Sequence, residues 1–141
     1  MTDTNRVPVI DGLFSEGPQG ARLLGSRCLS CATPYFPSAG TCHNPECSDS
    51  KIQDASFGPS GTVWSSSIQN YPPPVPARYD EPYVPYALGV VDLDDGLRVV
   101  GRMAVDDPSS VSVGDRVELV IEPLCHNEDG SEPISWMFRP T

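Results

Sequence analysis

The sequence predicts a mainly β protein, in which a short helix and a cysteine-rich module precede a small barrel or sandwich of five antiparallel strands. Three observations support this fold class. Four of the five cysteines lie close together, and apolar and polar residues alternate with period two from Gly61 onward. The 141 residues include 12 glycines and 16 prolines, together about a fifth, which leaves little room for long helices.

The first element is an expected helix over residues 8–17, in a segment that we place at residues 1–19. Asp11 is suited to cap the helix, and Gly17 with Pro18 would end it. Its apolar face would comprise Val9, Ile10, Leu13 and Phe14. We expect residues 20–27 to follow as a strand that leads into the cysteines.

The cysteine spacing C-x2-C-x10-C-x4-C is typical of a metal site, with ligands Cys28, Cys31, Cys42 and Cys47. Four thiolates suit one tetrahedral zinc ion, and a complete protein shell makes the site closed and structural. Two alternatives stay open. Iron could occupy a rubredoxin-like site, and His43 has a spacing to Cys47 that would also suit a ligand.

Five segments of the second half favour strands, namely residues 62–71, 87–93, 97–105, 116–122 and 134–139. Asp94-Asp95-Gly96 and Val113-Gly114-Asp115 are turn signals between them. Gly101, in the middle of a strand, would suit the bend that a barrel needs. With no helix between the strands, this pattern predicts an antiparallel barrel or sandwich.

The connection over residues 72–86, the Pro/Tyr loop, is expected to be stiff and extended. It holds the six prolines Pro72, Pro73, Pro74, Pro76, Pro82 and Pro85. The tyrosines in or beside it are Tyr71, Tyr79, Tyr83 and Tyr86. A stiff loop loses little entropy on docking and makes a good contact surface, although it could also simply cover the barrel mouth.

Charge and composition exclude several function classes. The net charge is −10, with −2 in residues 1–57 (6 acidic, 4 basic) and −8 in residues 58–141 (13 acidic, 5 basic). Such a surface repels nucleic acid. No apolar run reaches the roughly 18 residues of a membrane helix, and the first residues lack a secretory apolar region. We therefore expect a cytoplasmic protein with neither nucleic-acid nor membrane partners.

No residue set supports intrinsic catalysis. Cys125 and His126 could suggest a nucleophile and a base, but neighbouring residues of a strand point to opposite faces. His126-Asn127-Glu128 matches half of a zinc-deaminase signature, yet the C-x-x-C pair precedes it instead of following it. The sequence therefore predicts a protein without an active site of its own.

The order of these features resembles the bacterial and archaeal family of zinc-ribbon and OB-fold proteins that act with acyl-CoA enzymes. The matching pieces are residues 27–31, 35–37, Cys42, Cys47, 61–63, 85–96 and 113–117. Two departures are the C-x4-C second knuckle and Ala32, where a glycine is usual. The resemblance implies a rubredoxin-like zinc ribbon over residues 20–57 and a five-stranded OB-fold barrel over residues 58–141.

The resemblance also implies a function, that of an accessory subunit of a thiolase or a retro-aldol lyase that shortens acyl-CoA side chains. The thiolase-fold partner would carry the catalytic residues, in a hetero-tetramer. Any contact with the CoA phosphates would fall to Arg22, Arg27 and Lys51, although Arg27 and Lys51 are equally explained as surface charge. The partner contacts would come from the ribbon and the tyrosines Tyr71, Tyr79, Tyr83 and Tyr86. The rivals are a single-strand nucleic-acid binder and a small iron electron carrier.

Overall fold

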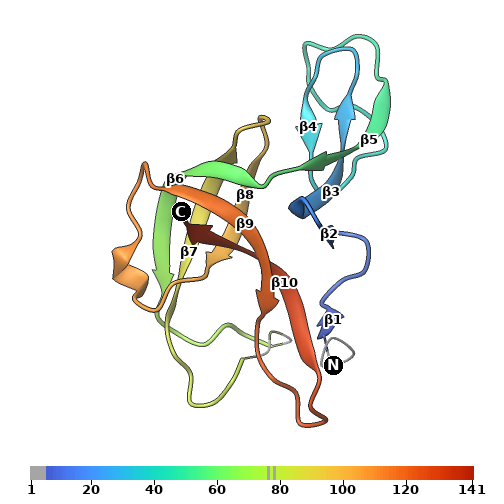
Figure 1. The fold of residues 1–141 in the computed structure, drawn as a ribbon. Coiled ribbons are helices and arrows are strands. Elements are labelled where there is room, and N and C mark those ends of the chain that lie inside the picture. Colours follow the sequence, from blue (N-terminus) through green and yellow to red (C-terminus); the bar gives the residue numbers. More distant parts are fainter. Residues whose placement is uncertain (1–5, 76, 78) are drawn as a thin grey trace.

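The computed structural model describes residues 6–75, 77 and 79–141 and is built from two β-sheets (Figure 1). The larger sheet contains the strands β6 (Ser60–Gln69), β7 (Tyr86–Leu93), β8 (Arg98–Met103), β9 (Arg116–Pro123) and β10 (Glu132–Pro140). Their order is β10-β8-β7-β6-β9, and β9 also pairs with β10, so the sheet closes. This closed barrel of five strands confirms the expected architecture, with the β8–β10 pairing parallel.

The barrel core follows from the alternation in the sequence. Along β7 and β8 every second residue is buried, and Phe138 of β10 is fully buried among them. Gly101 faces this ring, and a Cβ atom there would lie 2.7 Å from Phe138 Cε2. The pairing of β6 with β7 changes register in β6, between Val63 and Ser65. The glycine of β8 therefore provides space for an aromatic ring.

The second sheet, here the ribbon sheet, is centred on β3 (Gly20–Cys28), the strand expected at residues 20–27. β3 pairs antiparallel with β2 (Phe14–Gly17), β4 (Pro34–Tyr35) and β5 (Ile52–Phe57). Leu23 and Phe57 face each other across β3 and β5, and both are fully buried in the same core as the barrel residues. The ribbon sheet is thus packed on the barrel through its own side chains.

Two further contacts hold the ribbon sheet against the barrel. The Arg27 guanidinium donates hydrogen bonds to the carbonyl oxygens of Ala32 and Asp95, both at 2.7 Å, and lies over the Phe57 ring. The rings of Phe36 and Trp136 meet edge to face, with centroids 5.2 Å apart. β5 ends at Phe57 and β6 begins at Ser60, while the division into segments 1–19, 20–57 and 58–141 stays a prediction.

The helix expected over residues 8–17 is wrong. The chain forms β1 (Arg6–Pro8), which runs parallel to β10, then a turn, and then β2. Val9 and Ile10 are exposed, so the apolar residues that suggested one helical face have no common core to cover. Gly12 has φ +86°, which ends any helix there, and pairing with β3 and β10 outweighs the local periodicity.

The helical structure in the described residues is one 3-10 turn, η2 (Pro108–Ser110). The first five residues of the segment 1–19, and Pro76 of the Pro/Tyr loop, lie outside the described residues. The described part of the chain contains no helix with the length and hydrophobicity that spanning a bilayer requires.

We predict that Gly101→Ala destabilises the barrel by about 1–3 kcal/mol, because the new methyl group collides with the Phe138 ring. Chemical denaturation measures the effect. Gly17→Ala is the matched control, since a Cβ atom there meets nothing within 4 Å, and it should change stability by less than about 0.5 kcal/mol. Equal stability of the two variants would contradict this account of the core.

Candidate metal centre

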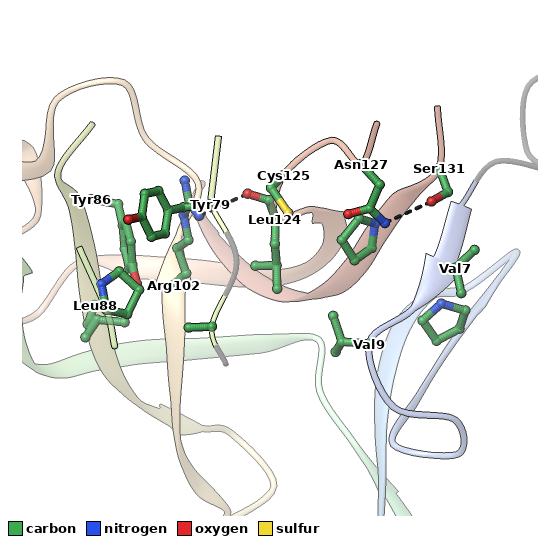
Figure 2. A pocket seen from close by; sticks show the side chains of 14 residues that line it. Val7, Val9, Tyr79, Tyr86, Leu88, Arg102, Leu124, Cys125, Asn127 and Ser131 are labelled. Carbon is green, nitrogen blue, oxygen red and sulfur yellow. Dashed lines mark hydrogen bonds between the residues drawn. The ribbon is translucent and has the colours of Figure 1, made fainter. Parts of the chain in front are cut away.

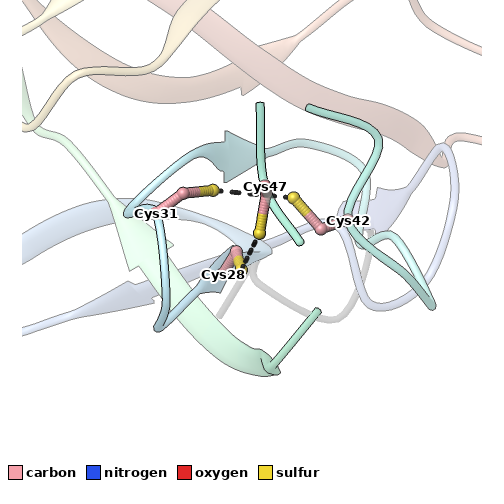
Figure 3. A group of neighbouring side chains, drawn as sticks. All are labelled: Cys28, Cys31, Cys42 and Cys47. Carbon is pink, nitrogen blue, oxygen red and sulfur yellow. Dashed lines mark hydrogen bonds between the residues drawn. The ribbon is translucent and has the colours of Figure 1, made fainter. Parts of the chain in front are cut away.

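The four clustered cysteines come together at one end of the ribbon sheet (Figure 3). Cys28 is the last residue of β3, Cys31 lies in the following turn, and Cys42 and Cys47 lie in the long loop between β4 and β5. Their sulfur atoms are all within 4.8 Å of one another, with 3.8 Å between Cys28 and Cys47 and 3.6 Å between Cys31 and Cys42.

These sulfur–sulfur distances fit the tetrahedral coordination of one metal ion. A zinc–sulfur bond of about 2.3 Å places the sulfur atoms of a regular tetrahedron about 3.8 Å apart. His43 is not in this group of donors: its backbone N–H donates to the Tyr35 hydroxyl, and its ring lies edge-on to the Tyr35 ring. The four sulfur atoms could therefore hold one metal ion without a histidine ligand.

The turn after β3 shapes the first half of the site. The Ala32 N–H donates to the Cys28 carbonyl oxygen at 2.7 Å, and the Cys28 N–H donates to the Thr33 carbonyl oxygen at 3.0 Å. This turn requires φ +67° at Ala32, a conformation that glycine adopts without strain. The backbone thus explains why a glycine is usual at this position in the family that the sequence resembles.

Polar groups around the sulfur atoms prepare them to act as thiolates. Hydrogen bonds from the backbone of Lys51 and Cys31 lower the pKa of Cys28 to about 6. The side chain of Thr33, 3.1 Å from the Cys31 sulfur, lowers the pKa of Cys31. The Tyr35 hydroxyl lies 3.3 Å from the Cys42 sulfur.

Cys47 shows the opposite effect. Its contact with the backbone of Asp49 lowers its pKa, but burial and the three neighbouring sulfur atoms raise the pKa to about 12. Four thiolates so close together repel one another, and a bound cation would remove this repulsion. The donor set therefore fits a divalent cation that prefers sulfur ligands. The sequence identified the four ligands but gave no signal for the roles of Thr33 and Tyr35.

The three cations considered for CoA do not converge. Arg22 and Arg27 stand five residues apart on β3, about 16 Å along an extended strand. Arg22 donates to the carbonyl oxygens of Gln19 and Ala21, and Lys51 lies on the surface beside Asp49. A role for these residues in CoA binding stays a prediction.

Three of the four tyrosines of interest lie together. Tyr83 has ring centroids 5.3 Å from Tyr79 and 6.3 Å from Tyr86, and its hydroxyl donates to the Gln69 carbonyl oxygen at 2.6 Å. Tyr71 is separate and is 79% exposed. The cluster fastens the Pro/Tyr loop to β6, while Tyr71 is available to a partner.

His126 connects the Pro/Tyr loop to the β9–β10 loop. Its ring nitrogens lie 2.7 Å from Asp80 Oδ2 and 3.0 Å from Glu132 Oε2. Its backbone N–H donates a hydrogen bond to Asp80 Oδ1 at 2.7 Å. Cys125, by contrast, is buried. Asp80 is 46 residues away in the sequence, so no local pattern could have predicted this clamp.

We predict that the metal centre holds one zinc ion per chain and that Tyr35→Phe lowers its affinity about 10- to 100-fold, because the hydroxyl beside Cys42 is lost. Competition with a chromophoric chelator measures this. Tyr71→Phe, on the exposed surface, should leave the affinity unchanged. A red protein with iron, or equal affinities of the two variants, would contradict the prediction.

The clamp predicts a pH-dependent loop. The hydrogen bond to Asp80 raises the pKa of His126 above its ordinary 6.5, and the His126 backbone and ring lower that of Asp80 below 3.8. The stabilisation from His126 is complete below pH 6.5 and is lost as the pH rises through the raised pKa. That from Asp80 is lost as the pH falls through its lowered pKa.

Amide exchange of residues 79–86 should therefore accelerate as the pH rises above 6.5, beyond the intrinsic increase, in the parent protein. His126→Gln should remove this additional step, and Glu128→Gln, an exposed neighbour in the same loop, should retain it. An unchanged profile in His126→Gln would show that the clamp does not hold the loop.

Comparisons with known proteins place this geometry in a family. The model of the C-terminal OB-fold domain of ChsH2 matches residues 56–122. A DUF35 domain-containing scaffold protein of Methanothermobacter thermautotrophicus is 34% identical over 125 residues, covering 87% of this chain and 90% of the relative. The benzoylsuccinyl-CoA thiolase subunit BbsA of Thauera aromatica is 29% identical over 127 residues, covering 88% and 82%.

A solved structure of the Ltp2-ChsH2(DUF35) aldolase shares the fold, with a TM-score of 0.61, 24% identity and 84% coverage of both chains. The resemblance to the zinc-ribbon and OB-fold family associated with acyl-CoA enzymes is thereby confirmed. The chain belongs to the family of DUF35 domain-containing scaffold proteins.

Proposed function

We propose that this chain is a non-catalytic accessory subunit of a cytoplasmic thiolase-type or retro-aldol acyl-CoA enzyme. Its family membership carries the proposal, since the relatives that align over most of its length include scaffold proteins and a thiolase subunit. The catalytic residues would belong to a thiolase-fold partner, and this chain would support that partner and help shape its CoA or substrate entrance.

The metal centre supports a structural role. Four cysteine sulfur atoms complete a tetrahedral shell, so a zinc ion held there has no open position for a substrate or a reactive water. Few apolar side chains are buried in the described part of the ribbon that holds the cysteines, away from the core shared with the barrel. Metal binding would therefore supply much of the folding free energy of this part.

His126, the histidine that follows Cys125, also fits a structural role. Both ring nitrogens of His126 face carboxylates, and the neighbouring Cys125 is buried. A nucleophile needs a base within hydrogen-bond reach, and here the base is occupied by the clamp.

The Pro/Tyr loop is suited to docking. Tyr71, Val75 and Val84 are 79%, 90% and 68% exposed, although the loop is anchored by the Tyr83 hydroxyl and the His126 clamp. Apolar side chains on an anchored, proline-rich loop can be buried at low entropic cost. We propose that this loop and the ribbon contact the partner, with two copies of the chain on a dimer of the enzyme.

Co-expression with a thiolase-fold protein encoded beside it, followed by size-exclusion chromatography, tests the proposal. A stable hetero-tetramer is the expected result. Tyr71→Ala and Val84→Ser should each weaken association, with the tyrosine costing about 2 kcal/mol if it is an anchor. Val113→Ser is the matched control, because Val113 is 69% exposed in a turn outside the loop.

Separate elution of the two proteins, together with full activity of the partner alone, would contradict the accessory role. Equal affinities of Tyr71→Ala, Val84→Ser and Val113→Ser in an intact complex would contradict the docking surface only. The two parts of the proposal can thus fail independently.

A further inference from the structure

A cavity of about 610 Å³ lies at the side of the barrel, away from the metal centre (Figure 2). Four segments that are distant in sequence form its wall: the β1 region, the Pro/Tyr loop with β7, β8, and the β9–β10 loop with the start of β10. Val7, Val9, Leu88 and Leu124 are among its apolar residues. Its volume is within the range of small-molecule sites, roughly 300–1,000 Å³.

The charge of the wall differs from that of the rest of the molecule. The chain has 19 acidic and 9 basic residues, yet none of the described residues that line the cavity is acidic, and Arg102 lines it. Among the described residues, the wall combines apolar side chains with the polar Asn127 and Ser131 and with the guanidinium of Arg102.

Arg102 is held in place but keeps hydrogen-bonding capacity. Its guanidinium lies over the Tyr86 ring, with Cζ 4.2 Å from the centroid, and Nη1 donates to the Leu124 carbonyl oxygen at a long 3.4 Å. Figure 2 shows the side chain between Tyr86 and Leu124. A guanidinium has five N–H groups, so a planar anion can still form two hydrogen bonds with it.

We propose that this cavity binds a small carboxylate with an apolar body, whose carboxylate pairs with Arg102 while the body packs on the aliphatic wall. An apolar wall with one placed cation selects for a ligand that has one anionic end. The site is separate from the metal centre, and the proposal does not depend on a thiolase-fold partner.

The test uses 4-phenylbutanoate as the probe and 4-phenyl-1-butanol as the uncharged analogue of the same shape. Titration of the full chain, followed by amide chemical shifts, should show saturable binding of the acid with shifts at Leu88, Arg102 and Leu124. The alcohol should bind the parent protein about tenfold or more weakly than the acid does. The acid should bind the variant Arg102→Gln about tenfold or more weakly than it binds the parent. In both cases the charge-assisted hydrogen bonds are lost.

A second pair of variants avoids any effect on the core. Val9, which is 40% exposed, lines the cavity, and Val9→Asp should weaken binding of the acid but not of the alcohol. Val113→Asp, at an exposed valine elsewhere, should bind both probes like the parent. Equal affinities for acid and alcohol, or no saturable binding at concentrations on the order of 10 mM, would overturn the proposal.

Discussion

The burial of Leu23 and Phe57 is the interaction on which the rest of the structure depends. The two side chains face each other across β3 and β5, are fully buried, and belong to the core of the barrel. Burial of such side chains stabilises a fold by about 1.5–3 kcal/mol each. Since β3 ends at Cys28 and β5 leads into β6, this contact fixes the position of the metal centre relative to the barrel.

The same constraint has a consequence for function. Arg27 joins the turn after Cys28 to the β7–β8 turn. The ribbon sheet is therefore held on the barrel by these hydrogen bonds as well as by the buried Leu23 and Phe57. A scaffold acts by presenting several surfaces in a defined arrangement, and a ribbon that moved freely could not do so. We propose that a metal ion at the four cysteines would order the ribbon, that the shared core orients it, and that the anchored Pro/Tyr loop would extend the docking surface.

The sequence predicted the parts of the fold that depend on regular patterns. The barrel strands alternate apolar and polar residues, and the four cysteines have the spacing that is typical of a compact metal site. The helix over residues 8–17 was wrong because Val9 and Ile10 remain exposed, and β5 was missed because its burial does not alternate. Apolar periodicity cannot show which neighbour a strand will pair with.

The finer features of the sites depend on contacts between distant residues. The Asp80–His126 clamp and the position of Arg102 between Tyr86 and Leu124 arise only when the barrel has closed. The Tyr35 hydroxyl beside Cys42 is similar, because β4 must first pair with β3. Such contacts have no local signature in a single sequence.

The most direct test of the proposed scaffold function is hydrogen–deuterium exchange of the chain alone and in complex with the proposed thiolase-fold partner. If the chain is a scaffold, new protection is expected in the Pro/Tyr loop and in the loops around Cys31 and Cys42, with little change in residues 127–131. Protection confined to residues 127–131, or no protection in a complex that forms, would contradict it.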